Sequence, residues 1–208
     1  PDEKENANPC REEVAAALKK LRNASWFRMD TTMLTEKGFT DMQVDYVLPD
    51  SMHQKVAVPA TKEKSEIILV GEKAWSKQGE GDWVEVSAEL TQNLKGQMQD
   101  QVVAHQEEIG NYSCKGRTKL EGRDVMSYKL EEEMRKDSDT PRNDAFRMFY
   151  VDAVTGFPVS NAIVVEGRDG KPIFKTNFSF PIDLKIVPPS KVCAASPPAP
   201  AAGDAMTP

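Results

Sequence analysis

The sequence predicts an α+β fold that combines an antiparallel β-sheet of about ten strands with two amphipathic helices. Three observations predict it. Apolar residues recur at helical spacing in two separate segments of the chain. Elsewhere they alternate with polar residues, as in strands that bury one face. Short turn sequences such as Lys37-Gly38 separate consecutive alternating segments, which favours an antiparallel meander.

The two helices are expected over residues 8–22 and 88–105. Asn8 can cap the first helix and Pro9 suits its first turn, while Ser87 can cap the second. Each helix carries one apolar stripe, formed by Val14, Leu18 and Leu21 in the first and by Leu90, Leu94, Met98 and Val102 in the second. Both helices should therefore lie on an apolar surface.

The strands follow each helix in short runs that are joined by turns. They are expected over residues 27–33, 40–48, 52–58, 66–70, 73–77, 112–120, 124–132, 145–151, 157–166 and 172–180. A charged loop is expected over 133–143. A long curved sheet cannot bury its inner face alone, and the two amphipathic helices can supply the cover.

Composition places the chain among globular proteins, with 39% hydrophobic and 29% charged residues in 208. One domain is expected over residues 8–187, between a flexible segment at 1–7 and a flexible Pro/Ala-rich tail at 188–208. The net charge of −6 and the lack of a basic cluster argue against nucleic acid as a partner. The polar start of the chain, with no methionine, predicts a mature secreted or periplasmic protein after signal-peptide removal.

The residues that chemistry would require do not form a recognisable catalytic or metal-binding motif. The two histidines, His53 and His105, lack partners at metal-ligand spacing, and no glycine-rich phosphate loop or nucleophile motif is present in the sequence. The sequence therefore predicts a protein that is not an enzyme and uses no cofactor and no metal.

Four sequence segments together resemble the bacterial lipoprotein-carrier superfamily, the LolA/LolB-like proteins. They are LRNASWFRMDTTM at residues 21–33, DYVLPDSMHQKV at 45–56, EIILVGEKAWSKQGEGDWVEV at 66–86 and YVDAVTGFPVSNAIVVEG at 150–167. The resemblance implies an incomplete, half-open antiparallel barrel whose concave face is covered by the helices over an apolar cavity, in a periplasmic or cell-surface protein. The carriers have a basic residue before the proline of the second segment, where this chain has Leu48.

The three cysteines are Cys10, Cys114 and Cys193. Spacing alone leaves open whether they pair or remain thiols. The tripeptides that end in Cys10 and Cys114 resemble the paired cysteines of some periplasmic relatives, and this resemblance implies a Cys10–Cys114 disulfide with Cys193 left over. Such a bond would close a loop of about 100 residues and stabilise the fold by roughly 4–5 kcal/mol.

The favoured function is binding of lipid or lipoprotein acyl chains in the apolar cavity. Methionine adapts its shape to variable apolar partners, and many of the nine methionines fall on alternating strand positions. Alternation predicts that the cavity is lined by Met33, Met42, Val44, Tyr46, Leu69, Met126 and Phe146 from the strands, and Leu94 and Met98 of the second helix complete the lining. The alternative is a cargo-free envelope interaction or sensor module with the same fold. Peripheral membrane contact and an envelope protein partner are compatible with both functions.

Overall fold

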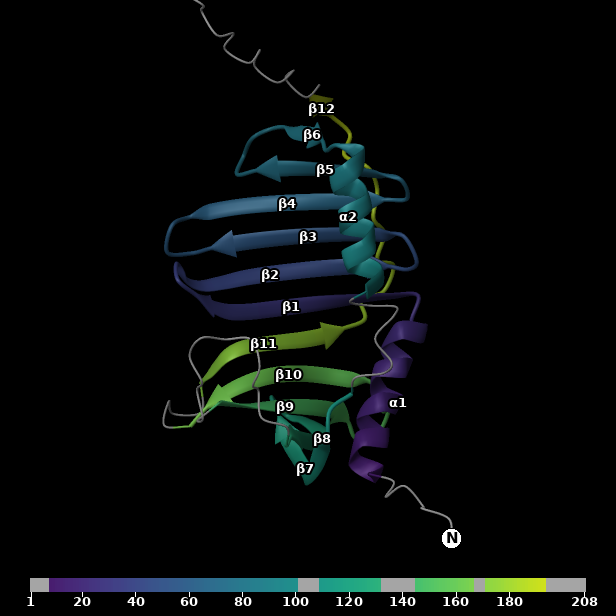
Figure 1. Cartoon of the computed structure of the whole chain (residues 1–208), viewed down its shortest axis with the longest axis vertical. Coiled ribbons are helices and arrows are strands. Elements are labelled where there is room, and N and C mark those ends of the chain that lie inside the picture. Colours follow the sequence, from purple (N-terminus) through teal and green to yellow (C-terminus); the bar gives the residue numbers. More distant parts are fainter. Residues whose placement is uncertain (1–7, 101–108, 132–144, 167–170, 194–208) are drawn as a thin grey trace, which may run out of the picture.

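The computed structural model describes residues 8–100, 109–131, 145–166 and 171–193. The strands form one twelve-stranded sheet in the order β12-β6-β5-β4-β3-β2-β1-β11-β10-β9-β8-β7 (Figure 1). The helices are α1 (Pro9–Asn23) and α2 (Ala88–Met98). The strands are β1 (Trp26–Thr35), β2 (Gly38–Val47), β3 (Ser51–Val58), β4 (Glu63–Val70), β5 (Lys73–Gln78), β6 (Trp83–Glu85), β7 (Tyr112–Leu120), β8 (Arg123–Leu130), β9 (Ala145–Asp152), β10 (Pro158–Val165), β11 (Pro172–Ser179) and β12 (Val192–Cys193).

The sheet consists of two meanders that meet at the pairing of β1 with β11. Strands β1 to β6 follow one another in space as they do in sequence, and so do β7 to β11. The pairing of β1 with β11 is antiparallel and aligns Thr31 with Thr176. Only the short pairing of β12 with β6 is parallel. Because β7 and β12 are the two edges and do not pair with each other, the described sheet is open.

The helices begin where the capping residues predict. The Asn8 side chain accepts hydrogen bonds from the backbone N–H groups of Cys10 and Arg11, and the Ser87 hydroxyl accepts one from Leu90. The first helix starts at Pro9, which has no N–H group to leave unpaired. Local sequence chemistry therefore sets both helix starts.

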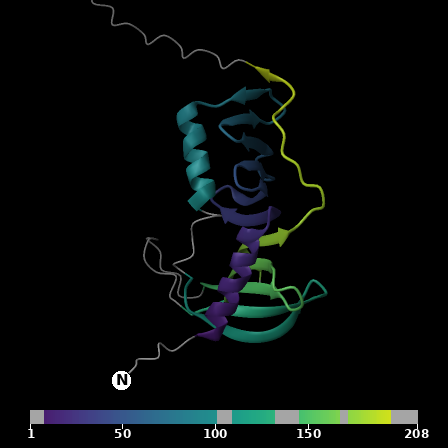
Figure 2. The same cartoon turned by 90° about the vertical axis from the view of Figure 1, so that its right-hand side faces the viewer.

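Alternation gives the sheet two distinct sides. We call the side that carries α1 and α2 the helix-facing side, and the opposite one the outer side. Figure 2 shows α2 on one side of the sheet and the segment after β11, coloured yellow, on the other. That segment leads from β11 to β12, and Trp26 Nε1 donates a hydrogen bond of 2.8 Å to the carbonyl of Pro181 within it.

Helix α1 is fastened to the β7–β10 half of the sheet. Cys10 forms a disulfide with Cys114 of β7, with Cα atoms 5.4 Å apart. The Tyr128 hydroxyl of β8 donates a hydrogen bond to the Glu13 carboxylate. Burial is the largest cause that raises the pKa of Tyr128, and the bond and charge of Glu13 raise it further. The disulfide predicted through the family resemblance is therefore present.

The predicted α+β class, the two helices and the open antiparallel sheet are confirmed. The sheet has twelve strands rather than about ten, because β6 and β12 are only three and two residues long. Runs this short show no alternation, and β12 lies inside the segment that was predicted as a tail. The described part of the second helix ends at Met98. Residues 1–7, 101–108, 133–143 and 194–208, which the predictions assign to the N-terminal segment, the helix end, the charged loop and the tail, fall outside the described residues.

The turn between β9 and β10 is organised by the carboxylate of Asp152. Asp152 accepts hydrogen bonds from the backbone N–H groups of Thr155 and Val154 and from the guanidinium of Arg123. The bond from Thr155 is the main cause that holds the pKa of Asp152 well below its usual range. The ionised carboxylate therefore stabilises the folded state.

Asp152→Asn is expected to lower the free energy of unfolding at pH 7 by about 1–3 kcal/mol, because these donors lose a charged acceptor. The depressed pKa makes this contribution complete above the unfolded value of about 3.9 and lost progressively as the pH falls below it. Denaturant titrations at pH 7 and pH 3 should therefore show a gap between wild type and variant that narrows at pH 3. A gap that widened at pH 3 would contradict this assignment.

Candidate functional site

The first apolar cluster lies between α2 and the strands of the first meander. Its buried members include Phe27, Tyr46, Leu69 and Met98, and Phe27 stacks on Tyr46 with ring centroids 5.0 Å apart. Burial raises the pKa of Tyr46 to about 12. The register aligns these strand residues in one row, since Phe27 pairs with Tyr46, Tyr46 with Met52 and Met52 with Leu69.

The second apolar cluster lies under α1. Val14 and Ala17 of the helix pack on Tyr128, Phe149 and Val151 of β8 and β9. Phe178 of β11 packs against both clusters and so joins them across the centre of the sheet. The helix-facing side therefore carries one continuous apolar band from β5 to β8.

The structure gathers most of the predicted cavity residues on this band. Six of them belong to or pack against the first cluster: Met42, Val44, Tyr46, Leu69, Leu94 and Met98. Met126 packs against the second cluster. Met33 lies on the same side further along β1, where it pairs with Phe174 and Thr40.

The structure corrects the predicted facing of Phe146. Phe149 of the same strand faces α1, so alternation places Phe146 on the outer side. There Lys129 Nζ lies 4.7 Å from the centroid of its ring. Apolar residues occupy both sides of β9, so its sequence does not reveal which side faces inward.

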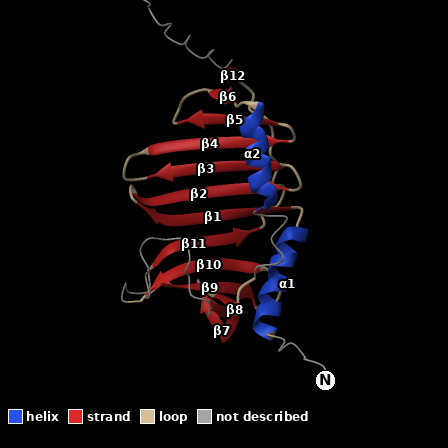
Figure 3. Ribbon diagram, viewed as in Figure 1, coloured by secondary structure: helices blue, strands red, loops and turns tan. Residues whose placement is uncertain are grey.

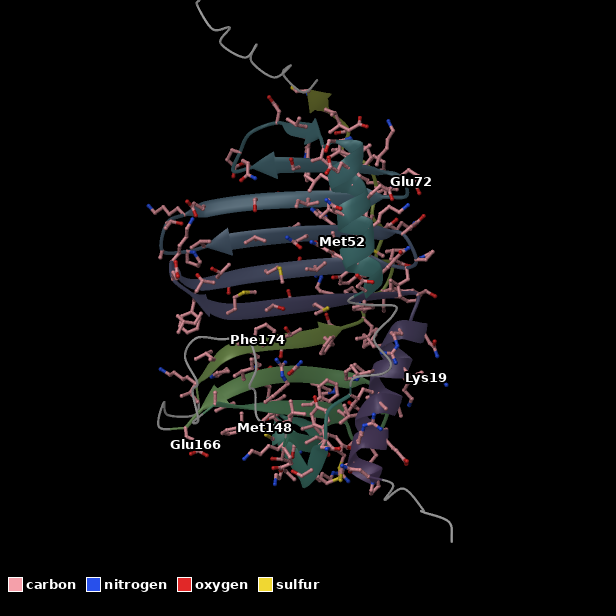
Figure 4. The ribbon with its side chains drawn as sticks, in the orientation of Figure 1. Lys19, Met52, Glu72, Met148, Glu166 and Phe174 are labelled. Atoms are coloured by element: carbon pink, nitrogen blue, oxygen red, sulfur yellow. A yellow bond between two sulfur atoms is a disulfide. The ribbon has the colours of Figure 1, made fainter. Side chains whose placement is uncertain are left out.

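Methionine is prominent in the first cluster. Met52 and Met98 are buried there, and the half-buried Met29 and Met42 pack against it. Figure 4 labels Met52 next to α2 and Met148 on β9, in the other half of the sheet. Side chains with three flexible bonds can rearrange around an apolar guest at little cost.

Helix α2 covers only part of the helix-facing side. It contacts β4 and β5, and Figure 3 shows no described helix over the opposite ends of β1 to β4. A hollow of about 570 Å³ opens at those opposite ends of β3, β4 and β5. Val56 and Val58 contribute to its wall from the helix-facing side, and Val56 pairs with Met42 of the apolar band. The rest of its lining is mostly polar and consists of Lys62, Glu63, Lys64, Ser65, Gln78 and Gly79. The hollow therefore adjoins the band beyond the end of α2.

The outer side of the same strands is polar. Arg28 donates two hydrogen bonds to Asp45, the shorter of 2.6 Å, and the bond to Asp45 is the main cause that raises the pKa of Arg28. Burial acts to raise the pKa of Glu66, but hydrogen bonds from Lys77 and His53 outweigh it and leave the pKa lowered. A groove of about 500 Å³ on this side is lined mainly by charged and amide side chains, which do not suit an acyl chain.

A polar strip runs beside the apolar band across β1, β11, β10 and β9, and the predictions missed it. Thr31 and Thr176 share a hydrogen bond of 2.7 Å between their buried hydroxyls. Beside them, Arg147 Nη1 donates to Asn161 Oδ1 at 2.9 Å, and the Arg147 guanidinium carbon lies 5.8 Å from the centroid of the Phe174 ring. The inverted facing of β9 in the prediction placed Arg147 on the outer side and concealed the strip.

The described residues lack two further features. No group of three or more His, Cys, Asp or Glu residues in that part of the chain is arranged to hold a metal ion. None of the helices seen there has the length and apolar character needed to cross a membrane.

Comparison with known proteins rests on structure, because no protein-family model and no curated protein matches the sequence. LprF from Mycobacterium bovis is similar to this chain with a TM-score of 0.58 and 13% identity, over 88% of this chain and 98% of that chain. The lipoprotein LppX from Mycobacterium tuberculosis is similar with a TM-score of 0.54 and 11% identity, over 83% of this chain and 95% of that chain.

A LolA superfamily protein from Nitrosomonas europaea also matches, at 11% identity over 82% of this chain and 92% of that chain. Its TM-score of 0.29 is too low to show a shared fold. The two fuller matches span nearly the whole of LprF and LppX. This chain therefore shares the fold of LprF and LppX. At these identities the likeness shows the fold alone.

Proposed function

We propose that this protein binds lipid or lipoprotein acyl chains, without catalysis, on the apolar band between the sheet and α2. The observation that supports this function is the apolar band itself, whose first cluster contains the buried Met52 and Met98 and the half-buried Met29 and Met42. The lining comprises the helix-facing residues of the band, without Phe146.

Displacement of α2 by a guest is energetically reasonable. The described part of α2 is eleven residues long, and within it Leu94 and Met98 contact the first cluster. Exposing two such side chains costs about 1.5–3 kcal/mol each. A guest that buries about ten methylene groups gains about 8 kcal/mol, at about 0.8 kcal/mol per group. The guest therefore outweighs the part of the cover that it replaces.

We place this function in the periplasm or outside the cell. A disulfide between Cys10 and Cys114 requires an oxidising compartment to persist. LppX, one of the two similar structures, is a lipoprotein by its description. A protein in such a compartment would meet acyl chains at a membrane surface.

Uptake of a fluorescent fatty acid tests this function. Two variants are compared, at neighbouring residues whose side chains lie on opposite sides of the sheet. Met42 lies on the helix-facing side, and Gln43 points to the outer side, where it donates a hydrogen bond to Asp30. Met42→Glu places a charge in the path of the acyl chain, so its affinity for the probe should fall by about tenfold or more. Gln43→Glu should bind like the wild type.

Native mass spectrometry of the protein purified from membranes should also show co-purified lipid. A wild-type protein that carries no lipid and takes up no fatty acid would contradict the proposed function. It would favour the cargo-free interaction module, which needs no accessible apolar band.

A further inference from the structure

We propose that the bound lipid carries an anionic head group, such as a carboxylate or a phosphate, and that Arg147 binds this group on the helix-facing side of β9. This inference rests on the proposed function, since the acyl chain must lie on the apolar band. It adds the polar half of the ligand and a residue that selects for it.

The facing of Arg147 follows from the register of the sheet. Asn161 of β10 pairs with Phe149 of β9, which packs under α1, so both side chains lie on the helix-facing side. Arg147 lies two residues before Phe149 and therefore shares its side, and its hydrogen bond to Asn161 agrees with this. Phe174, labelled on β11 in Figure 4, provides the ring that faces the guanidinium.

The partners of Arg147 among the described residues are neutral. Phe146 and Met148 flank it in the sequence. Its side chain contacts the amide oxygen of Asn161 and the ring of Phe174. Among the residues that the structure describes, no carboxylate forms an ion pair with it, whereas Arg28, Arg117 and Arg123 each have one. Within the described residues the half-buried guanidinium has no counter-charge, which is costly, and its bond to Asn161 uses one of its five N–H donors, so up to four can serve a ligand.

The neighbourhood suits an amphiphile that bridges polar and apolar parts of one face. Thr176 pairs with Asn161 on one side and with Thr31 on the other, so hydroxyl and amide groups extend from Arg147 toward β1. Met42 on β2 is four strands from Arg147, a distance of roughly 19 Å at the usual strand spacing. An extended acyl chain can cover this distance, with its head group at Arg147 and its tail on the band.

Binding of a fatty acid and of its uncharged methyl ester tests separately the role of the head group and that of the acyl chain. The affinities of the full chain for a pyrene-labelled fatty acid and for its methyl ester are measured by fluorescence titration at neutral pH. The wild type is expected to bind the acid about tenfold more tightly than the ester, as one charge-assisted hydrogen bond provides. Arg147→Met should bind both equally and leave the affinity for the ester unchanged.

Lys129→Met is the matched control. Lys129 also lies over a phenylalanine ring, but on the outer side of the adjacent strand, so its loss should leave the preference for the acid intact. Arg147→Lys keeps the charge and should retain most of the preference, which tests the role of Arg147 even if Arg147→Met folds poorly. A wild type that binds acid and ester equally, or an Arg147→Met variant that keeps the preference, would overturn the anionic head group. If wild type bound neither probe, the proposed function itself would fail.

Discussion

Removal of the Cys10–Cys114 disulfide, by Cys10→Ser together with Cys114→Ser, is expected to lower the free energy of unfolding by about 2–5 kcal/mol. The bond joins residues that are 104 positions apart in the sequence, so the cross-link removes much conformational freedom from the unfolded chain. It also ties the start of α1 to β7, which is an edge strand with one neighbouring strand in the sheet.

Urea titrations of the double variant and of wild type measure this loss. Cys193→Ser is the control, since Cys193 is an exposed free thiol and its replacement should change the free energy by less than about 0.5 kcal/mol. Equal unfolding midpoints for the double variant and wild type would contradict a structural role for the bond. Wild type measured with a reducing agent should follow the double variant.

Phe27→Ala is expected to destabilise the fold by about 3–5 kcal/mol, the range for loss of a fully buried aromatic side chain. Phe27 has no exposed surface, stacks on Tyr46 of the neighbouring strand β2 and lies in the first cluster. Truncation leaves a cavity that the rigid strand backbones around it cannot close, so the lost contacts are not replaced.

Phe39→Ala provides the matched comparison for this variant. Phe39 lies on the neighbouring strand β2 and is 46% exposed, so its truncation should cost less than about 1 kcal/mol. Calorimetric melting of both variants gives the two losses side by side. Equal losses for Phe27→Ala and Phe39→Ala would show that the first cluster does not form the core described above.

The regular elements of this fold could be predicted because their sequences repeat a period. The buried side of α1 is marked by Val14 and Leu21 at helical spacing, and the buried side of the strands β1 to β4 is marked by alternation. The strands β6 and β12 could not be predicted, because three and two residues contain no period and the pairing of β12 depends on a distant strand. Short turns predicted that consecutive strands are neighbours, whereas the pairing of β1 with β11, which joins the two meanders, was not predicted.

The candidate site was predictable where only one side of a strand is apolar. In β2, Met42, Val44 and Tyr46 alternate with polar residues, and all three contribute to the first cluster as expected. In β9, large apolar side chains occupy both sides, so alternation could not decide between Phe146 and Phe149. The same ambiguity hid Arg147, whose neutral partners come from β10 and β11.

Paramagnetic broadening of methionine methyl signals by a spin-labelled fatty acid tests most directly whether the acyl chain lies on the helix-facing side. Met42, Met52 and Met98 belong to the apolar band, and Met148 lies on the outer side of β9, one residue from Phe149. We expect the signals of the three band methionines to broaden as the probe is added, while that of Met148 stays sharp. Broadening of Met148 with sharp signals from Met52 and Met98 would place the chain elsewhere and contradict the account.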